Sequence, residues 1–497
     1  MSVFLGIDVG TQSVKALCFD TDKRAVVAQS SSALELDSRD DGTREQLAQW
    51  WVTALRSCLN EIDSDTRKLI SAIGVSGQQH GFVPLAADGS VLAPVKLWCD
   101  TATLSQCEQI TEAFGGADKC IRETGNPVLP GYTSPKILWL KQNHPDLYDR
   151  LDTILLPHDY INFYLTGEKV MECGDASGTG LLDVRNRSWH PGMLAAVDSE
   201  RDLSECLPSL VSPENFIGKV LPEIASDLGI PAGTPVSAGG GDNMMAAIGT
   251  GNIAPGRLTI SLGTSGTLFA YSEKPIVDPE GSLAAFCDST GSWLPLLCTM
   301  NCTVATELTR KMLGMSLKEL DREISDIPPG SGGVITLPFF QGERTPNLPR
   351  GQGCIFGLNQ ANYSSGNLLR SAMESAVFGL RAGLDRFIDL GCDIESIRLT
   401  GGGASSAVWR QIVADVFDLP VTVQKNDEGA ALGAALQAAW VYEKSHSGKA
   451  ELRDLVDAAL ELDQSKCCDP IEQHVQVYKE QYQRYQSYLA TVTPLYQ

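Results

Sequence analysis

The sequence of 497 residues lacks several features that would each point to a particular class of protein. Its fourteen cysteines form no C-x-x-C pair, which disfavours a zinc or disulfide framework and favours reduced thiols in a cytoplasmic protein. Basic residues number 39 against 61 acidic ones, and the net charge of −22 disfavours general binding to nucleic acid or anionic membranes. No uncharged apolar run reaches transmembrane length. The start, MSVFLGIDVGT, does not read as a signal peptide, because Asp8 interrupts a short apolar run.

Two common nucleotide-binding motifs are missing as well, since there is no GxxxxGK[ST] and no GxGxxG after an N-terminal strand. Hydrophobic residues make up 43% of the chain, enough for large cores in roughly two to four domains. Strand patterns alternate with helical ones, which predicts the α/β class. We expect helices over Glu45 to Leu59, Gly366 to Leu390 and Ile471 to Thr491, and a domain boundary near the turn-rich Gly249 to Gly256.

Three short stretches recur in the same order in the two halves of the chain. LGIDVGTQSVKALCFD matches LTISLGTSGTLFAYSE when Thr11 is aligned with Thr264. AIGVSGQ resembles SIRLTGGGASS, and PVSAGGGDNMMAAIG resembles PVTVQKNDEGAALGAA, with Asp242 opposite Asp427. Three matches in order predict two homologous domains, although such β-turn-β and β-α units are also common in unrelated α/β proteins.

The first pair of stretches reads as two β-hairpins, each with a Gly-Thr turn. Backbone amides in a tight turn can converge on an anion, so a hairpin from each domain could hold a polyphosphate from two sides. Asp8 of the first hairpin aligns with Ser261 of the second. An acid beside a phosphate needs a divalent cation between them, so we interpret Asp8 as a Mg²⁺-organising residue, the alternative being a plain turn or edge-strand Asp.

Three glycines precede Asp242 in SAGGGDNMMAAIGTG. Glycines before a helix are typical of a phosphate-binding turn, and an Asp at that position is also a common N-cap. A carboxylate on exposed backbone can instead accept a proton from a hydroxyl group. Because the duplication assigns phosphate binding to the hairpins, an N-cap and a general base stay open for Asp242, and cap-like bonds are compatible with both.

The chain resembles the FGGY carbohydrate kinases from about Leu5 to Trp440, in the stretches GIDVGTQSVKA, GYTSPKILWLKQN, SLGTSGT, LPFFQGERTP, LTGGGASSAVWRQIVADVFDLPV and EGAALGAALQA. The resemblance implies an α/β fold of two ribonuclease-H-like domains, of the actin/hexokinase type, flanking a central cleft for ATP and sugar. Residues 1–250 would form the sugar-binding domain, with a C-terminal helix of about 468–497 returning to it. Residues 251–467 would form the nucleotide-binding domain.

The same resemblance implies roles for individual residues, with ATP and Mg²⁺ as the cofactors. Asp242 matches the catalytic base, and Asp8 matches the acid needed for Mg·ATP. Gln79 and His80 match a pair that binds sugar hydroxyls, and Asn243 is a further candidate sugar contact. The phosphate-loop positions are Thr11, Gln12, Ser13, Gly263, Thr264 and Ser265, and the adenosine-loop positions are Gly402, Gly403 and Ala404.

Two stretches, VSGQQHG and LLPHDYINFYLTGE, are most similar to family members that convert D-xylulose to D-xylulose 5-phosphate. The chain departs from the common bacterial pattern at Gln79, Cys99 and Ala102, which leaves ribulose, a hexulose or another polyol open as the substrate. A non-catalytic sugar sensor is a further alternative, disfavoured by the presence of both Asp8 and Asp242. The oligomeric state stays open, a homodimer included.

Overall fold

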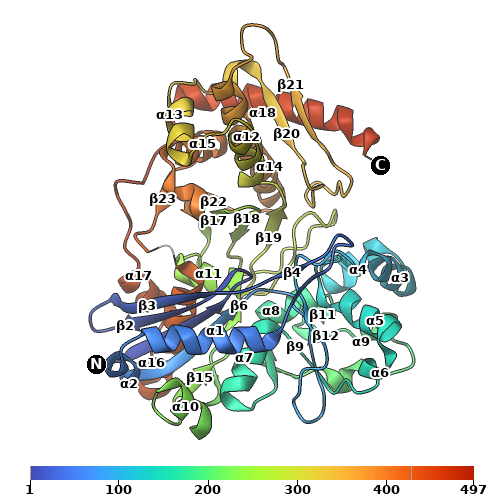
Figure 1. Ribbon diagram of the computed structural model, residues 1–497, viewed down its shortest axis with the longest axis vertical. Helices are drawn as coiled ribbons and strands as arrows, with labels where there is room; N and C mark the ends of the chain where they lie inside the picture. The colour runs from blue at the N-terminus through green and yellow to red at the C-terminus, as the bar shows by residue number, and fades with distance from the viewer. Residues whose placement is uncertain (1, 427, 497) are drawn as a thin grey trace. The chain divides into compact units, whose positions relative to one another are not determined.

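The computed structural model describes residues 2–426 and 428–496, which divide into two compact units (Figure 1). Unit 1 comprises residues 2–253, 271–295 and 428–460, and unit 2 comprises residues 254–270, 296–426 and 461–496. The first boundary falls within the turn-rich stretch expected from the sequence. None of the helices in the described part of the chain is long and apolar enough to span a bilayer.

The main sheet of unit 1 has the strand order β14-β15-β6-β1-β2-β3. Its first hairpin is antiparallel, whereas β6 runs parallel to β1, and both β15 and β16 run parallel to β6. The carboxyl ends of β1, β6 and β16 therefore lie at the same edge of the sheet. The strands are β1 (Val3–Val9), β2 (Ser13–Asp20), β3 (Ala25–Ala33), β6 (Ile70–Gly77), β14 (Phe216–Lys219), β15 (Pro235–Ser237) and β16 (Gly240–Gly241).

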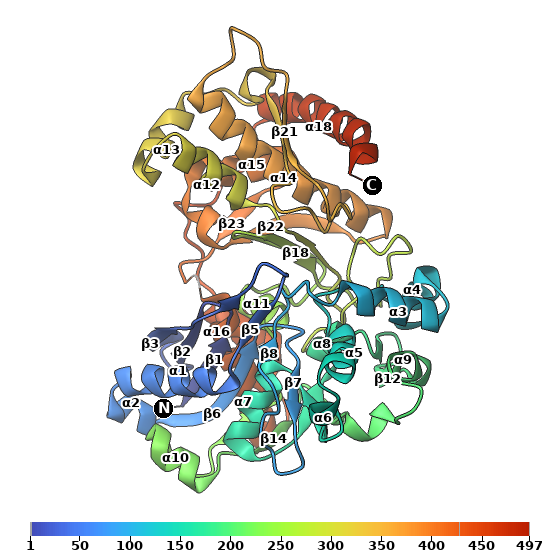
Figure 2. The same cartoon turned by 45° about the vertical axis from the view of Figure 1, so that its right-hand side comes forward.

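Helices cover both faces of this sheet, as Figures 1 and 2 show. Alternate residues of β1, such as Leu5 and Ile7, are buried in one core with Trp51 of α1 (Ala48–Glu61). The residues between them face α16 (Gly429–Ser447), which packs on β1, β6 and α11 (Asp242–Gly249). Successive side chains of a strand point to opposite faces, so a strand that is covered on both faces contributes alternate residues to each side.

A helical lobe within unit 1 follows the first strands and has its own apolar core. His158 and Asp175, which return below, lie outside this core: α7 (Pro157–Thr166) packs into the core of the main sheet, and α8 (Cys173–Ala176) packs into a smaller third core. The helices of the lobe are α3 (Leu104–Phe114), α4 (Ala117–Thr124), α5 (Thr133–Asn143), α6 (Pro145–Tyr148) and α9 (Pro191–Val197).

The sheet of unit 2 repeats the plan of unit 1, with the order β19-β18-β17-β22-β23. The antiparallel hairpin β17-β18 again has a parallel neighbour, β22, and β23 continues in parallel. Asp8 and Ser261 occupy equivalent register positions, opposite Ser76 and Thr400. The predicted duplication is confirmed for the sheets, while Asp427 lies outside the described residues. The strands are β17 (Gly256–Leu262), β18 (Gly266–Ala270), β19 (Leu296–Thr299), β22 (Ile394–Thr400) and β23 (Val421–Val423).

The C-terminal helix α18 (Glu472–Val492) packs within unit 2, so the prediction that it returns to the first domain is wrong. Its buried Tyr478 donates a hydrogen bond to Glu374 of α14 (Ser365–Asp389), at 2.9 Å, and accepts one from Arg370 at 2.9 Å. Tyr485 is buried beside Phe378 of the same helix. By contrast, α16 packs on the sheet of unit 1, although its residues fall in the range that was predicted to form the second domain.

Candidate functional site

The candidate site of unit 1 lies where its parallel strands end. Asp8 is the penultimate residue of β1, Gln79 follows β6, and Asp242 follows β16. Ser76 of β6 stands opposite both Asp8 of β1 and Gly240 of β16, so the three strands end in register. Ligands of open α/β sheets bind at this edge, outside the carboxyl ends of the strands.

Asp242 is the first residue of α11 and is half-buried. Its Oδ1 accepts the backbone N–H of Asn243 at 2.8 Å and the Asn243 side-chain amide at 2.9 Å. Burial, with the nearby charges of Asp8 and Asp175, raises the pKa of Asp242 to about 8. A carboxylate held in this way is a proton acceptor close to neutral pH, which a general base requires.

The glycine before Asp242 is explained by close packing rather than by phosphate binding. A Cβ on Gly241 would come within 2.7 Å of the side chain of Gln79. Gln79 itself is buried, and its Oε1 accepts a hydrogen bond from the Asn243 amide at 2.9 Å. The structure therefore brings Asp242, Asn243 and Gln79 into one hydrogen-bonded group.

His80 lies beside this group with an unusual backbone, at φ 66°. Its ring packs at 4.9 Å between centroids from Tyr132 and at 5.7 Å from Phe286. The buried ammonium group of Lys136 donates to the His80 carbonyl oxygen at 2.7 Å, which holds the strained residue in place. Burial lowers the pKa of Lys136 to about 7. Lys136 belongs to the stretch GYTSPKILWLKQN, but it had no assigned role.

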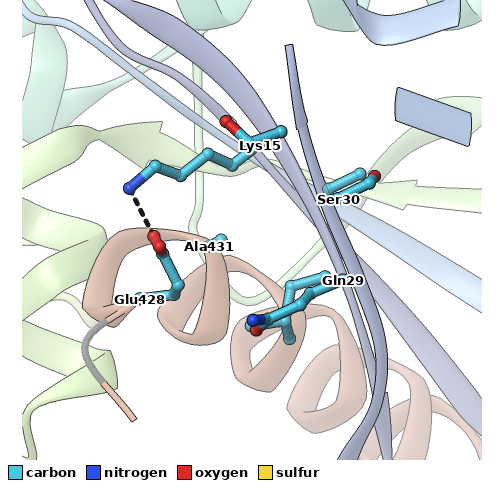
Figure 3. Close-up of a pocket in the computed structure, with 8 residues that line it drawn as sticks. Lys15, Gln29, Ser30, Glu428 and Ala431 are labelled. Carbon is cyan, nitrogen blue, oxygen red and sulfur yellow. Dashed lines mark hydrogen bonds and ion pairs between the residues drawn. The ribbon is translucent and has the colours of Figure 1, made fainter. Parts of the chain in front are cut away.

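Asp8 is held by Ser76, whose hydroxyl donates to its Oδ1 at 2.8 Å. Burial raises the pKa of Asp8, the Ser76 hydrogen bond and Lys15 lower it, and Glu428 raises it. Lys15 of β2 points to Glu428 at the start of α16, with Nζ 2.5 Å from Oε2 (Figure 3). This ion pair borders a cavity of about 160 Å³ that Gln29 and Ser30 of β3 also line.

The first Gly-Thr turn is tied into unit 1 by its threonine. The Thr11 hydroxyl donates to Gln78 at 2.9 Å and accepts from the indole of Trp98 at 3.0 Å. The backbone N–H of Gly10 donates to the Ser13 carbonyl at 3.0 Å and closes the turn, leaving Gln12 exposed. With its hydroxyl engaged on both sides, Thr11 can offer an anion only its backbone N–H.

The second turn and the predicted adenosine loop are neighbours within unit 2. Gly263, Thr264 and Ser265 connect β17 to β18, and Thr264 is exposed. A 3₁₀ helix, η4 (Gly402–Ser405), follows β22 and packs on β17. Gly402, Gly403 and Ala404 therefore begin at the carboxyl end of the strand beside that turn.

A buried glutamate that the sequence left without a role supports the second turn. Glu343 accepts hydrogen bonds from the backbone N–H groups of Met300 at 2.6 Å and Asn301 at 3.3 Å. The next two residues bind the turn, because Cys302 donates to the Thr264 carbonyl at 2.9 Å and Thr303 donates to the Gly263 carbonyl. Only the sequence motif LPFFQGERTP pointed to this glutamate.

A second buried cluster, of His158, Asp175 and Glu172, adjoins the candidate site and was not predicted. These side chains are almost fully buried, and His158 Nδ1 lies 2.6 Å from Asp175 Oδ2. The stretch LLPHDYINFYLTGE contains His158, but nothing in the sequence links it to Asp175, 17 residues away. Within the described residues, no group of three or more metal-ligating side chains is placed to hold a metal ion.

Family models match both halves of the chain. The N-terminal domain of the FGGY family of carbohydrate kinases matches residues 3–249, and the C-terminal domain of that family matches residues 258–442. Their boundary agrees with the first boundary between the two compact units.

Individual proteins are similar over most of their length. A xylulose kinase of Haemophilus influenzae is 41% identical, covering 98% of this chain and 99% of its own. A xylulose kinase of Streptomyces coelicolor is 39% identical over 88% of this chain and 87% of its own. The crystal structure of a "xyloylose kinase" from Brucella ovis superposes with a TM-score of 0.91 at 30% identity, covering 99% of this chain and 100% of its own.

Proposed function

Since this chain belongs to the FGGY family of carbohydrate kinases, we propose that it transfers the γ-phosphoryl group of ATP to D-xylulose, with D-xylulose 5-phosphate and ADP as products. The observation that carries the choice of reaction is the half-buried Asp242, hydrogen-bonded to Asn243 beside the buried Gln79. The choice of sugar rests on the relatives named xylulose kinase, which match nearly the full chain.

In the proposed reaction, Asp242 accepts the proton of the sugar hydroxyl as its oxygen attacks the γ-phosphorus. The bond between that phosphorus and the bridging oxygen of ADP breaks, and ADP leaves with the electron pair. A free hydroxyl is a poor nucleophile at neutral pH, and a positioned base contributes ~10²–10⁴-fold to such a step. The remaining acceleration comes from positioning and from neutralising charge on the phosphoryl group.

The sugar is assigned to unit 1. Gln79 and Asn243 carry amides that can donate to and accept from hydroxyl groups, and His80 adds an imidazole. The rings of Tyr132 and Phe286 pack around His80 and form an apolar wall next to these polar groups. A few polar groups set in an apolar surround are typical of small-molecule sites.

The nucleotide is assigned to the hairpin turns and to unit 2. Thr11, Gln12 and Ser13 of one turn, and Thr264 and Ser265 of the other, are the candidates to offer backbone amides to phosphate oxygens, while the N–H of Gly263 donates to the Ser265 carbonyl and closes its turn. Gly402, Gly403 and Ala404 provide the adenosine loop. Asp8 is the residue that would hold Mg²⁺, which binds one or two carboxylates and completes its shell with water and phosphate oxygens. When bound, the ion supplies positive charge to the phosphates.

A coupled ADP-release assay over a panel of ketoses and polyols tests the proposed function. We expect turnover with D-xylulose to exceed that with D-ribulose, D-fructose, xylitol and glycerol by at least about tenfold, because each of these compounds loses one or two well-placed hydroxyl contacts in the site. Stronger turnover with another sugar of the panel would reassign the substrate within the same chemistry. ATP hydrolysis that does not depend on any sugar would overturn the kinase proposal.

Two further expectations from the sequence concern the location and the oligomeric state. None of the fourteen cysteines, all of which lie in the described part of the chain, forms a disulfide, which supports a reducing, cytoplasmic location. A homodimer stays a prediction, and light scattering on the purified chain would measure its mass.

A further inference from the structure

His158 and Asp175 form a buried ion pair that the proposed reaction does not use directly. His158 lies in the first turn of α7, and Asp175 lies in α8. Both side chains are fully buried, with Nδ1 of the imidazole 2.6 Å from Oδ2 of the carboxylate. Replacing one member of such a pair would leave an uncompensated buried charge, so its presence next to a candidate site needs a reason.

Other carboxylates determine the charge of this pair. Burial disfavours a charged His158, but the adjacent Asp159 and Asp175 outweigh it and raise the pKa of His158 well above its ordinary value. Nε2 of the imidazole lies 3.0 Å from Asp159 Oδ1. Burial raises the pKa of Glu172 to about 8, so this neighbour adds little negative charge at neutral pH. The cation at His158 therefore lies between two carboxylates and compensates one of their charges.

Asp175 reaches the candidate site through Gln79. Oδ1 of Asp175 and Nε2 of Gln79 are buried and have no hydrogen bond of ordinary geometry among the described residues. Burial raises the pKa of Asp175 to about 6, and His158 and the Gln79 amide lower it, so the amide lies near the carboxylate without an aligned hydrogen bond. Because a carboxylate only accepts, Nε2 must face Asp175, and this leaves Oε1 to face Asn243.

The remaining links lead to the base. Oε1 of Gln79 accepts from Asn243 Nδ2 at 2.9 Å, and the same Nδ2 donates to Asp242 Oδ1 at 2.9 Å. We propose that the buried pair His158–Asp175 is a positioning pair that fixes the Asp242 carboxylate through these two amides. This inference rests on the proposed role of Asp242 as the general base.

The pair also acts on the base through its charge. Burial is the main cause of the raised pKa of Asp242, and the charges of Asp8 and Asp175 follow. Removing the charge of Asp175 therefore moves the ionisation of Asp242 to lower pH. The pH profile therefore reports the charge of Asp175 at the base, whereas kcat of a variant that retains this charge reports the positioning.

The test compares Asp175→Asn with wild type in kcat, in KM for each substrate and in the pH dependence of kcat/KM for D-xylulose. An asparagine side chain can present its NH2 group instead of an oxygen to Gln79, which would displace the amides and with them the Asp242 carboxylate. The displaced base should lower kcat by ~10²-fold. The acidic limb of the profile should shift to lower pH, with KM for ATP unchanged. Wild-type kcat and an unmoved limb would overturn the inference.

Asp159→Asn is the matched control. It removes an equally buried charge beside the same His158 but retains an oxygen for the Leu156 backbone N–H, which donates to Asp159 at 3.0 Å. We expect it to keep kcat within a few-fold of wild type and to shift the limb less than Asp175→Asn. An equal effect of both variants would mean that net charge acts without the Gln79 and Asn243 amides, and would contradict the positioning role.

A second variant keeps the proposal testable if Asp175→Asn does not fold. Asp175→Glu retains the charge but moves the carboxylate by about the length of one methylene, so kcat should fall while the acidic limb stays in place. Wild-type kcat in this variant would contradict positioning. Asp242→Asn distinguishes the proposed function from the inference about the pair. If Asp242→Asn retains turnover, the assignment of Asp242 as the base fails. If it is inactive while the Asp175 variants are unaffected, only the inference about the pair is refuted.

Discussion

Asp242 occupies the first turn of α11, where two effects on its pKa oppose each other. The amino end of a helix favours a negative charge by typically about 0.3–1 kcal/mol, which would lower the pKa by less than about one unit. Burial and the charges of Asp8 and Asp175 act in the other direction and raise the pKa to about 8. Desolvation therefore wins, and the free carboxyl group is only partly ionised at neutral pH.

The pH dependence of catalysis follows from this balance. The base acts in its ionised form, so kcat/KM for D-xylulose should fall as the pH drops below about 8, approaching one decade per pH unit. Steady-state rates measured between about pH 6 and pH 9 in buffers of constant ionic strength test the sign and the position of the limb. A profile that is flat through neutral pH would contradict the raised pKa.

Residues close together along the chain were predicted better than those that the fold brings together. Asp242 and Asn243 are adjacent, and their link to Gln79 follows from the parallel strands that end beside each other. Asp175 is far from Gln79 along the chain and lies in α8, which has no counterpart in the duplicated stretches. A periodic pattern does not contain such a contact, so the buried pair could not be predicted.

At the scale of elements, α16 depends on glycine for its close approach to the sheet of unit 1. A Cβ on Gly74 of β6 would lie 2.0 Å from the backbone oxygen of Ala434. On the neighbouring strand, a Cβ on Gly6 would lie 1.8 Å from the oxygen of Ala431. Backbone atoms of a packed helix cannot rotate away as a side chain can, so a larger residue must displace the helix itself.

Gly74→Ala should therefore reduce the free energy of unfolding by about 3 kcal/mol or more, at the upper end of overpacking effects. Equilibrium denaturation of the purified variant, followed by far-UV circular dichroism, gives this value. Gly379→Ala is the control, because a Cβ there would meet nothing closer than 3.8 Å and alanine favours the interior of α14. Equal stability of Gly74→Ala and wild type would contradict the close packing of α16.

At the scale of the whole molecule, the duplication allowed the two sheets to be predicted, whereas the assignment of helices to units was partly wrong. Pattern matching detects strands and the turns between them, because these repeat in order in both halves. It does not tell which sheet a helix covers. A helix was correctly expected over Ile471 to Thr491, but only the pairing of Tyr478 with Glu374 and Arg370 identifies the partner of α18 as unit 2.

The most direct test of the central claim is a comparison of wild type and Asp242→Asn in phosphoryl transfer from ATP to D-xylulose, with the sugar phosphate identified by ³¹P NMR. We predict that the variant folds with a melting temperature no lower than wild type, because it removes a carboxyl group whose ionisation burial disfavours, and that it still binds ATP. Its kcat should fall by ~10²-fold or more. Turnover near the wild-type level would contradict the role of Asp242 as the general base.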